Sequence, residues 1–201
     1  MGQLKKTAVV GAGAWGTALS IILSKNFEEV SVWAREAEIV DSVARLRENS
    51  VFLPNIKIPQ NVRFSQNPGE VLKGAQMVVW VVPIKYLAAT AGDFSQFVEE
   101  GSIMVNAGKG IEVGTWRRPS EILETAIRQA SSVGSIMGPN IAYEVAQDKY
   151  AEDIVALTSH SDSIIAAGAF STPNFIVSPS DDVVGVEIGA ALKNIVALAA
   201  G

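Results

Sequence analysis

Residues 7–16 read TAVVGAGAWG, a short apolar strand followed by a glycine-rich turn that opens an Ala/Leu/Ile-rich helix of about residues 15–25. The glycines of this Gly-x-Gly-x-x-Gly pattern have separate roles: Gly11 allows a tight turn, Gly13 lets backbone approach a pyrophosphate, and Gly16 lets the helix pack on the strand. Free N–H groups at the helix N-terminus would bind the pyrophosphate. The stretch predicts a dinucleotide site, with a glycine-rich turn that binds nothing as the alternative.

Composition limits the class of protein. The 201 residues are 48% hydrophobic and 18% charged, which predicts a well-cored globular chain. The net charge of −5 argues against a nucleic-acid or anionic-membrane surface, so we expect no nucleic-acid partner. The absence of cysteine excludes disulfides, thiolate metal sites and a cysteine nucleophile, and we expect no metal site. Residues 1–6 lead into a strand too short for a signal-peptide core, which favours a cytoplasmic protein.

Strand and helix patterns alternate along the chain. Further strands are predicted at 30–33, 62–65, 77–82, 102–106, 135–137, 154–158 and 175–177, and helices at 36–48, 87–98, 119–129, 141–147 and 161–169. In the first helix Leu19, Ile22 and Leu23 should face inward, and in the second Ile39, Val43 and Leu46. Repeated alternation of this kind predicts an α/β fold with a doubly wound, Rossmann-type, mostly parallel sheet over residues 1–180.

Residues 181–201 break this alternation. They read as one helix with apolar residues around most of its circumference, which is typical of a helix buried inside a larger body. Because Glu187, Lys193 and Asn194 interrupt it, we do not expect a membrane span. We interpret it as the first helix of a second, helical substrate domain that is truncated in this chain. Left exposed, its apolar face would favour self-association, for example as a homodimer.

Arg35 bears on the choice of cofactor. An NAD site expects an acidic residue about 20 residues after the glycine pattern, and Arg35 stands at that place. An arginine can pair with a 2′-phosphate through two hydrogen bonds and stack on adenine, which favours NADP over NAD. NAD stays open because Glu36 is the next residue, and Arg35 could also be a solvated charge at a helix start.

Three further stretches carry polar groups suited to chemistry. NAGKG, residues 106–110, follows a strand, and its Lys109 has room between two glycines to face an anion, or it is simply an exposed turn lysine. GPNIAYE, residues 138–144, joins a strand to a helix, with Asn140 as the expected N-cap. Lys193 lies within the apolar terminal helix. A lysine in a water-poor pocket tends towards a lowered pKa, which suits a general acid or base.

Together these stretches resemble the N-terminal, NAD(P)-binding part of the glycerol-3-phosphate dehydrogenase family. The similar segments, in family order, are residues 11–18, 52–56, 81–83, 108–112, 138–146 and 186–194. They cover nearly the whole chain, so the set is specific although each member alone is not. One departure is Asn140, which stands where the bacterial pattern usually has serine and resembles the eukaryotic version.

The resemblance implies interconversion of dihydroxyacetone phosphate and glycerol 3-phosphate by hydride transfer with a nicotinamide cofactor. It implies that Lys193 is the general acid or base on the C2 oxygen, and that Lys109, Asn194 and Gly138 contact the substrate. The cofactor contacts that it implies are Gly11, Gly13, Ala14, Trp15, Gly16, Arg35, Pro83, Lys109 and Ala142. The family's C-terminal helical domain, which supplies an acidic partner for the lysine and an arginine for the phosphate, is missing here. We therefore expect this chain to be inactive alone.

Two alternatives remain. The chain could be a non-catalytic, stand-alone NAD(P)-binding module, although such a module should not end in an unburied apolar helix unless it dimerises through it. It could also belong to another two-domain dehydrogenase, such as a hydroxyacid or sugar-nucleotide enzyme. That class shares the glycine pattern but does not explain residues 108–110 and 192–194 together.

Overall fold

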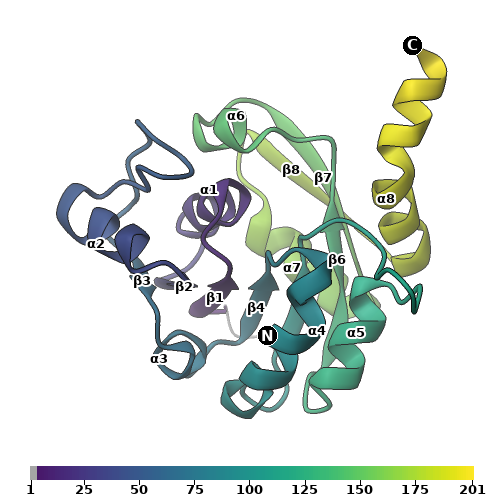
Figure 1. Cartoon of the computed structure of the whole chain (residues 1–201), viewed down its shortest axis with the longest axis horizontal. Helices are drawn as coiled ribbons and strands as arrows, with labels where there is room; N and C mark the ends of the chain where they lie inside the picture. The colour runs from purple at the N-terminus through teal and green to yellow at the C-terminus, as the bar shows by residue number, and fades with distance from the viewer. Residues whose placement is uncertain (1–3) are drawn as a thin grey trace.

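The computed structural model describes residues 4–201 and contains one eight-stranded sheet with helices on both faces (Figure 1). The strands are β1 (Lys6–Val10), β2 (Glu29–Trp33), β3 (Val62–Ser65), β4 (Met77–Trp80), β5 (Ile103–Asn106), β6 (Ser132–Met137), β7 (Ala151–Leu157) and β8 (Phe175–Ser180). Their order is β3-β2-β1-β4-β5-β6-β7-β8. All neighbours pair in parallel except β6 and β7. The predicted doubly wound, mostly parallel sheet is confirmed.

Helices cover the two faces of the sheet unequally. They are α1 (Ala14–Leu23), α2 (Ala37–Leu46), α3 (Pro68–Leu72), α4 (Ile84–Phe94), α5 (Pro119–Ala126), α6 (Ala142–Ala146), α7 (His160–Phe170) and α8 (Val183–Ala200), with a short 3₁₀ turn at Ser95–Phe97. Buried side chains of α1, α2, α6 and α7 form one core, and those of α3, α4 and α5 form the other. Because both faces are covered, all four residues of β4 and of β5 are buried, and Asn106 is the one polar residue among them.

The strand order reverses between β1 and β4, which lie side by side although two strands separate them in sequence. In open α/β sheets a crevice forms at the carboxyl ends of the strands where the order reverses, because the following loops turn to opposite faces. Here the turn after β1 and the residues after β4 flank that point. The fold therefore places the glycine pattern at the mouth of a ligand crevice.

Several predicted details are wrong. Leu46 is 56% exposed because α2 ends there and Arg47 takes a left-handed conformation with φ of 51°. Helix α3 was not predicted; it begins with Pro68 and is capped by the Asn67 side chain, which accepts from the Gly69 N–H. The antiparallel direction of β7 relative to β6 was also not predicted. Leu19, Ile22, Leu23, Ile39 and Val43 are buried as expected.

Helix α8 lies against the body at its first turns and then extends away from it (Figure 1). Within this chain it is not buried all round: Glu187 is its one buried residue, and Leu192, Ile195 and Leu198 are exposed. Its 18 residues have a mean hydropathy of 1.7, so by length and composition alone it could cross a membrane. A single helix of this kind is weak support for a membrane span, since the core helices of soluble proteins can be equally long and apolar.

Candidate functional site: a crevice at the carboxyl ends of the sheet

The glycine pattern forms a close contact between β1, α1 and the residues after β4. Gly11 has a φ of 118°, and a Cβ on it would collide with the carbonyl oxygen of Val81. A Cβ on Gly16 would collide with the carbonyl oxygen of Gly11. A Cβ on Gly13 would meet no atom within 4 Å. Gly11 and Gly16 are thus required by the fold itself, whereas the space in front of Gly13 is open for a ligand.

A pair of alanine variants separates folding from binding at this turn. Gly16→Ala should cost about 1–3 kcal/mol of unfolding free energy, because the backbone must shift to relieve the clash. Gly13→Ala should leave stability nearly unchanged, since Gly13 has a φ of −67° that alanine adopts, but should weaken dinucleotide binding about tenfold or more. Urea unfolding and NADH titration of both variants measure these effects. Equal binding by Gly13→Ala and the wild type would contradict a pyrophosphate at this turn.

The crevice continues from the turn as a cavity of about 400 Å³ along the ends of β4, β5 and β6. Its lining residues are Ala14, Trp15, Val81, Val82, Pro83, Ala107, Gly108, Lys109, Asn140 and Ala142. They include Ala14, Trp15, Pro83, Lys109 and Ala142, residues for which the family resemblance implies cofactor contact. Helix α1 has no side-chain cap at Gly13, so its first N–H groups are free to face an anion. The residues present therefore fit an elongated dinucleotide.

Two lysines from distant parts of the chain meet beside this cavity. The Lys109 ammonium donates to the carbonyl oxygen of Gly138 at 3.1 Å. Partial removal from water and the neighbouring Lys193 ammonium lower the pKa of Lys109, while the Asp153 carboxyl opposes this shift. Lys193 lies on α8 and, with Gly138, lines a second cavity of about 520 Å³ between α8 and the ends of β6, β7 and β8. The neighbouring ammonium groups of Lys109 and Lys193 favour an anionic ligand between them.

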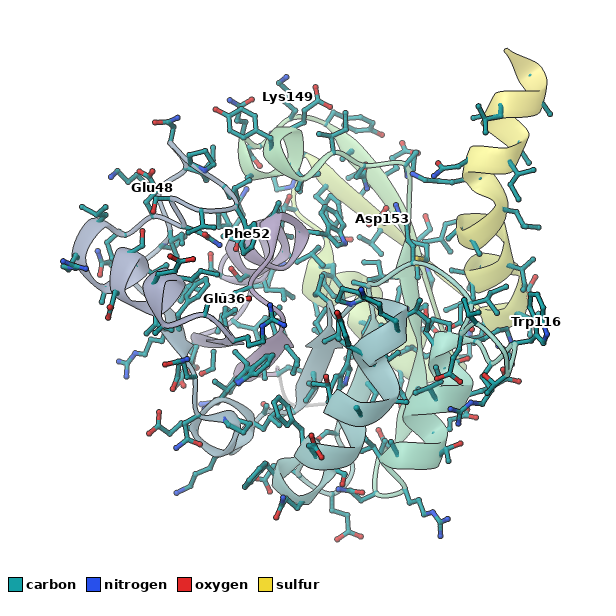
Figure 2. The ribbon with its side chains drawn as sticks, in the orientation of Figure 1. Glu36, Glu48, Phe52, Trp116, Lys149 and Asp153 are labelled. Carbon is teal, nitrogen blue, oxygen red and sulfur yellow. The ribbon has the colours of Figure 1, made fainter. Side chains whose placement is uncertain are left out.

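Asn194 and Arg35 are exposed, and neither is among the residues that line the two cavities. Asn194 lies on α8. Arg35 follows β2 and forms an ion pair at 2.7 Å with the next residue, Glu36, which is labelled in Figure 2. Lys85 chiefly, and Arg35 more weakly, lower the pKa of the exposed Tyr86 phenol on α4. Arg35 is therefore close enough to Tyr86 of α4 to act on it electrostatically.

Asp153, which was not predicted as a site residue, lies in the interior of the molecule (Figure 2) and interacts electrostatically with Lys109. Only 4% of this β7 residue is exposed, and burial raises the pKa of its carboxyl to about 7, against the attraction of Lys109. Oδ1 accepts from the Asn140 amide at 2.6 Å, while Oδ2 has no hydrogen-bond partner within residues 4–201. The expected N-cap role of Asn140 is wrong: Ile141 precedes α6, and the Asn140 side chain turns to β7 instead. The predicted strand began at residue 154, so the inward position of Asp153 escaped notice.

Glu187 was interpreted only as a charge that argues against a membrane span. The structure buries it, with 2% exposed, between α8, α5 and β6. Its carboxylate accepts hydrogen bonds from the Ser120 backbone N–H (2.9 Å), the hydroxyls of Ser120 (2.8 Å) and Ser135 (2.6 Å), and the Arg118 guanidinium (3.0 Å). These bonds attach α8 to the body, and they thereby hold Lys193 near Lys109. Among the described residues, no group of three His, Asp or Glu side chains is placed to bind a metal ion.

Comparisons with known proteins agree with this geometry. The family model described as "NAD-dependent glycerol-3-phosphate dehydrogenase N-terminus" matches residues 6–163. A glycerol-3-phosphate dehydrogenase [NAD(P)+] of Citrifermentans bemidjiense is 39% identical over 98% of this chain and 59% of its own length. A relative so named in Mycobacterium bovis is 36% identical over 100% of this chain and 60% of its length. The chain thus spans about 60% of the length of these relatives.

Solved structures give the same result. The crystal structure of glycerol-3-phosphate dehydrogenase from Coxiella burnetii matches 98% of this chain and 60% of its own with a TM-score of 0.90 and 27% identity. That of the yeast Saccharomyces cerevisiae matches 97% of this chain and 62% of its own, with a TM-score of 0.87 and 27% identity. A ternary complex of GDP-mannose dehydrogenase from Pseudomonas aeruginosa shares the fold at 10% identity and a TM-score of 0.73.

Proposed function

Because this chain belongs to the NAD-dependent glycerol-3-phosphate dehydrogenase family, we propose that it binds a nicotinamide dinucleotide in the crevice and carries the lysines for interconverting dihydroxyacetone phosphate and glycerol 3-phosphate. The observation that carries the proposal is the convergence of Lys109 and Lys193 beside a cavity that begins at the glycine pattern. A reduced nicotinamide, when bound, supplies the hydride. The residues of this chain bind and orient the reactants and move the proton.

The charges of the site suit this reaction. Reducing the C2 carbonyl adds a hydride to carbon and a proton to oxygen, so negative charge develops on the oxygen as the hydride arrives. The Lys193 ammonium is the proposed donor of that proton, and it takes the proton back in the reverse direction. Lys109, held by the Gly138 carbonyl, contributes a second positive charge towards the carbonyl oxygen and the substrate phosphate. Asn194 is proposed as a further substrate contact.

We assign residues 1–180 to the cofactor domain and residues 181–201 to the start of the substrate domain. The support is the distribution of contacts: α8 buries a single residue against the sheet, and its exposed apolar side chains are typical of a helix that packs against further protein or a second copy. A cytoplasmic location and self-association as a homodimer are part of the same proposal.

Binding and turnover should separate in this 201-residue chain. We expect it to bind NADPH or NADH but to reduce dihydroxyacetone phosphate at a negligible rate, because Lys193 and Asn194 are exposed to water and nothing in residues 4–201 encloses a substrate around them. Tryptophan fluorescence measures binding, since Trp15 lines the cavity, and loss of NADPH absorbance measures turnover. Ready turnover would contradict the need for enclosure. Absence of dinucleotide binding in a folded sample would refute the proposed function.

Arg35 is proposed to select NADP over NAD. Arg35→Ala should weaken NADPH binding by about tenfold to a hundredfold, the loss of one or two charge-assisted hydrogen bonds, and should change NADH binding little. Arg45→Ala is the matched control, because Arg45 is an exposed arginine on neighbouring α2. Glu36→Gln should strengthen NADPH binding, since Arg35 would no longer have to leave its ion pair. Equal losses for both cofactors in Arg35→Ala would argue against this role.

A further inference from the structure

We propose that the amide oxygen of Asn140 accepts a hydrogen bond from the carboxamide of the nicotinamide ring, and that Asp153 is the positioning residue that turns this oxygen into the cavity. The inference rests on the proposed dinucleotide binding. Neither residue takes part in the proton transfer proposed for the two lysines.

The hydrogen bonds of Asn140 fix which end of its amide faces which way. Nδ2 donates to Asp153 Oδ1 at 2.6 Å and to the Glu152 carbonyl oxygen at 3.2 Å. A backbone carbonyl can only accept, so the nitrogen must face β7. A flipped amide would set its oxygen against two acceptors. The amide oxygen is therefore the polar atom that Asn140 has left for a ligand in the cavity it lines.

Asp153 is costly where it lies, which suggests that it serves the site. Its carboxyl is 4% exposed, and Oδ2 has no partner in the described part of the chain. An apolar residue at this inward position of β7 would avoid that cost. Gly138 makes the room, because a Cβ there would collide with Asp153 Oδ1. Oδ1 can accept from Asn140 whether the carboxyl is protonated at Oδ2 or ionised, so the amide keeps its orientation in both states.

The rest of the cavity explains why the ligand group is a carboxamide. Trp15, Val82, Pro83 and Ala142 line it with apolar surface, which suits the faces of a nicotinamide ring. The carboxamide of that ring has two N–H donors and needs an acceptor. The other polar side-chain groups of the lining, the Lys109 ammonium and the Trp15 indole N–H, are donors only. An acceptor fixed at Asn140 would hold the ring at one rotation and so determine which face of it meets the substrate.

Two ligands that differ by the nicotinamide test this role: NADH and ADP-ribose. Asn140→Ala and Asp153→Ala should each weaken NADH binding about fivefold to tenfold, the loss of one hydrogen bond, and leave ADP-ribose binding within about twofold. Asp153→Asn keeps an acceptor for the Asn140 nitrogen and should bind NADH like the wild type. The double alanine variant should bind NADH no more weakly than Asn140→Ala, because both changes remove the same contact.

The possible results are distinguishable. Binding of ADP-ribose by each variant shows that it is folded around an intact adenosine and pyrophosphate site. Unchanged NADH binding in Asp153→Ala would overturn the inference, and so would an equal loss for both ligands, which indicates a general structural role. A loss in Asp153→Asn as large as in Asp153→Ala would contradict the acceptor role of Oδ1. If the wild type binds neither ligand, the proposed function fails first, and this inference fails with it.

Discussion

Glu187→Ala is expected to raise the population of undocked α8 about a hundredfold, a loss of about 3 kcal/mol. The substitution removes the carboxylate that accepts four hydrogen bonds. The Ser120 N–H, the Ser120 and Ser135 hydroxyls and the Arg118 guanidinium then lose this acceptor. Leaving such donors buried and unsatisfied costs more than exposing them to water, so α8 should detach. Hydrogen exchange of α8 amides and trypsin cleavage after Lys193 would report the detachment.

Two control variants isolate this effect. Glu124→Ala removes an exposed carboxylate from α5 and should change α8 protection little. Glu187→Gln keeps the shape and one acceptor oxygen, so its effect should lie between those of the wild type and Glu187→Ala. Detachment should also take Lys193 away from Lys109, which would return the pKa of Lys109 towards its ordinary value. Unchanged α8 protection in Glu187→Ala would mean that apolar contacts alone hold the helix.

Asp153→Asn is expected to make the chain more stable than the wild type at pH 8 but not at pH 4. The Asp153 carboxyl has a pKa of about 7 in the folded chain, against an ordinary value of 3.8. The folded state therefore binds the proton more tightly, and the stability linked to that proton is lost as the pH rises from about 4 to 7. The loss amounts to at most about 4 kcal/mol, and asparagine, which does not ionise, avoids it.

Urea unfolding of the wild type and of Asp153→Asn between pH 4 and pH 8 would measure the difference in their unfolding free energies. This difference should grow up to about pH 7 and then level off. Asp93→Asn is the matched control, because Asp93 is exposed on α4 and should give a difference that does not change with pH. A difference of the same size at pH 4 and pH 8 would show that Asp153 has an ordinary pKa. Together with unchanged NADH binding, a gain in stability would separate the charge of Asp153 from its hydrogen bond to Asn140.

The sequence by itself was enough to predict the sheet, the position of the crevice and several of the residues that line it. This follows because local patterns carry that information: β-branched runs predict buried parallel strands, and Gly11 and Gly16 are required where backbone meets backbone. The loops that follow parallel strands meet at one edge of the sheet. The family resemblance implied that Trp15, Pro83 and Lys109, which are distant in the chain, contact one cofactor, and all three line the same cavity.

Only the tertiary structure decided which polar groups are buried and what they contact. In the sequence Asp153 looks like one more acidic residue at the edge of a strand, Asn140 like a helix cap, and Glu187 like a charge on an apolar helix. The antiparallel pairing of β7 with β6 places Asp153 under Asn140, and the packing of α8 places Glu187 against two serines from α5 and β6. Such contacts join residues 13 to 67 positions apart, and no local pattern specifies them.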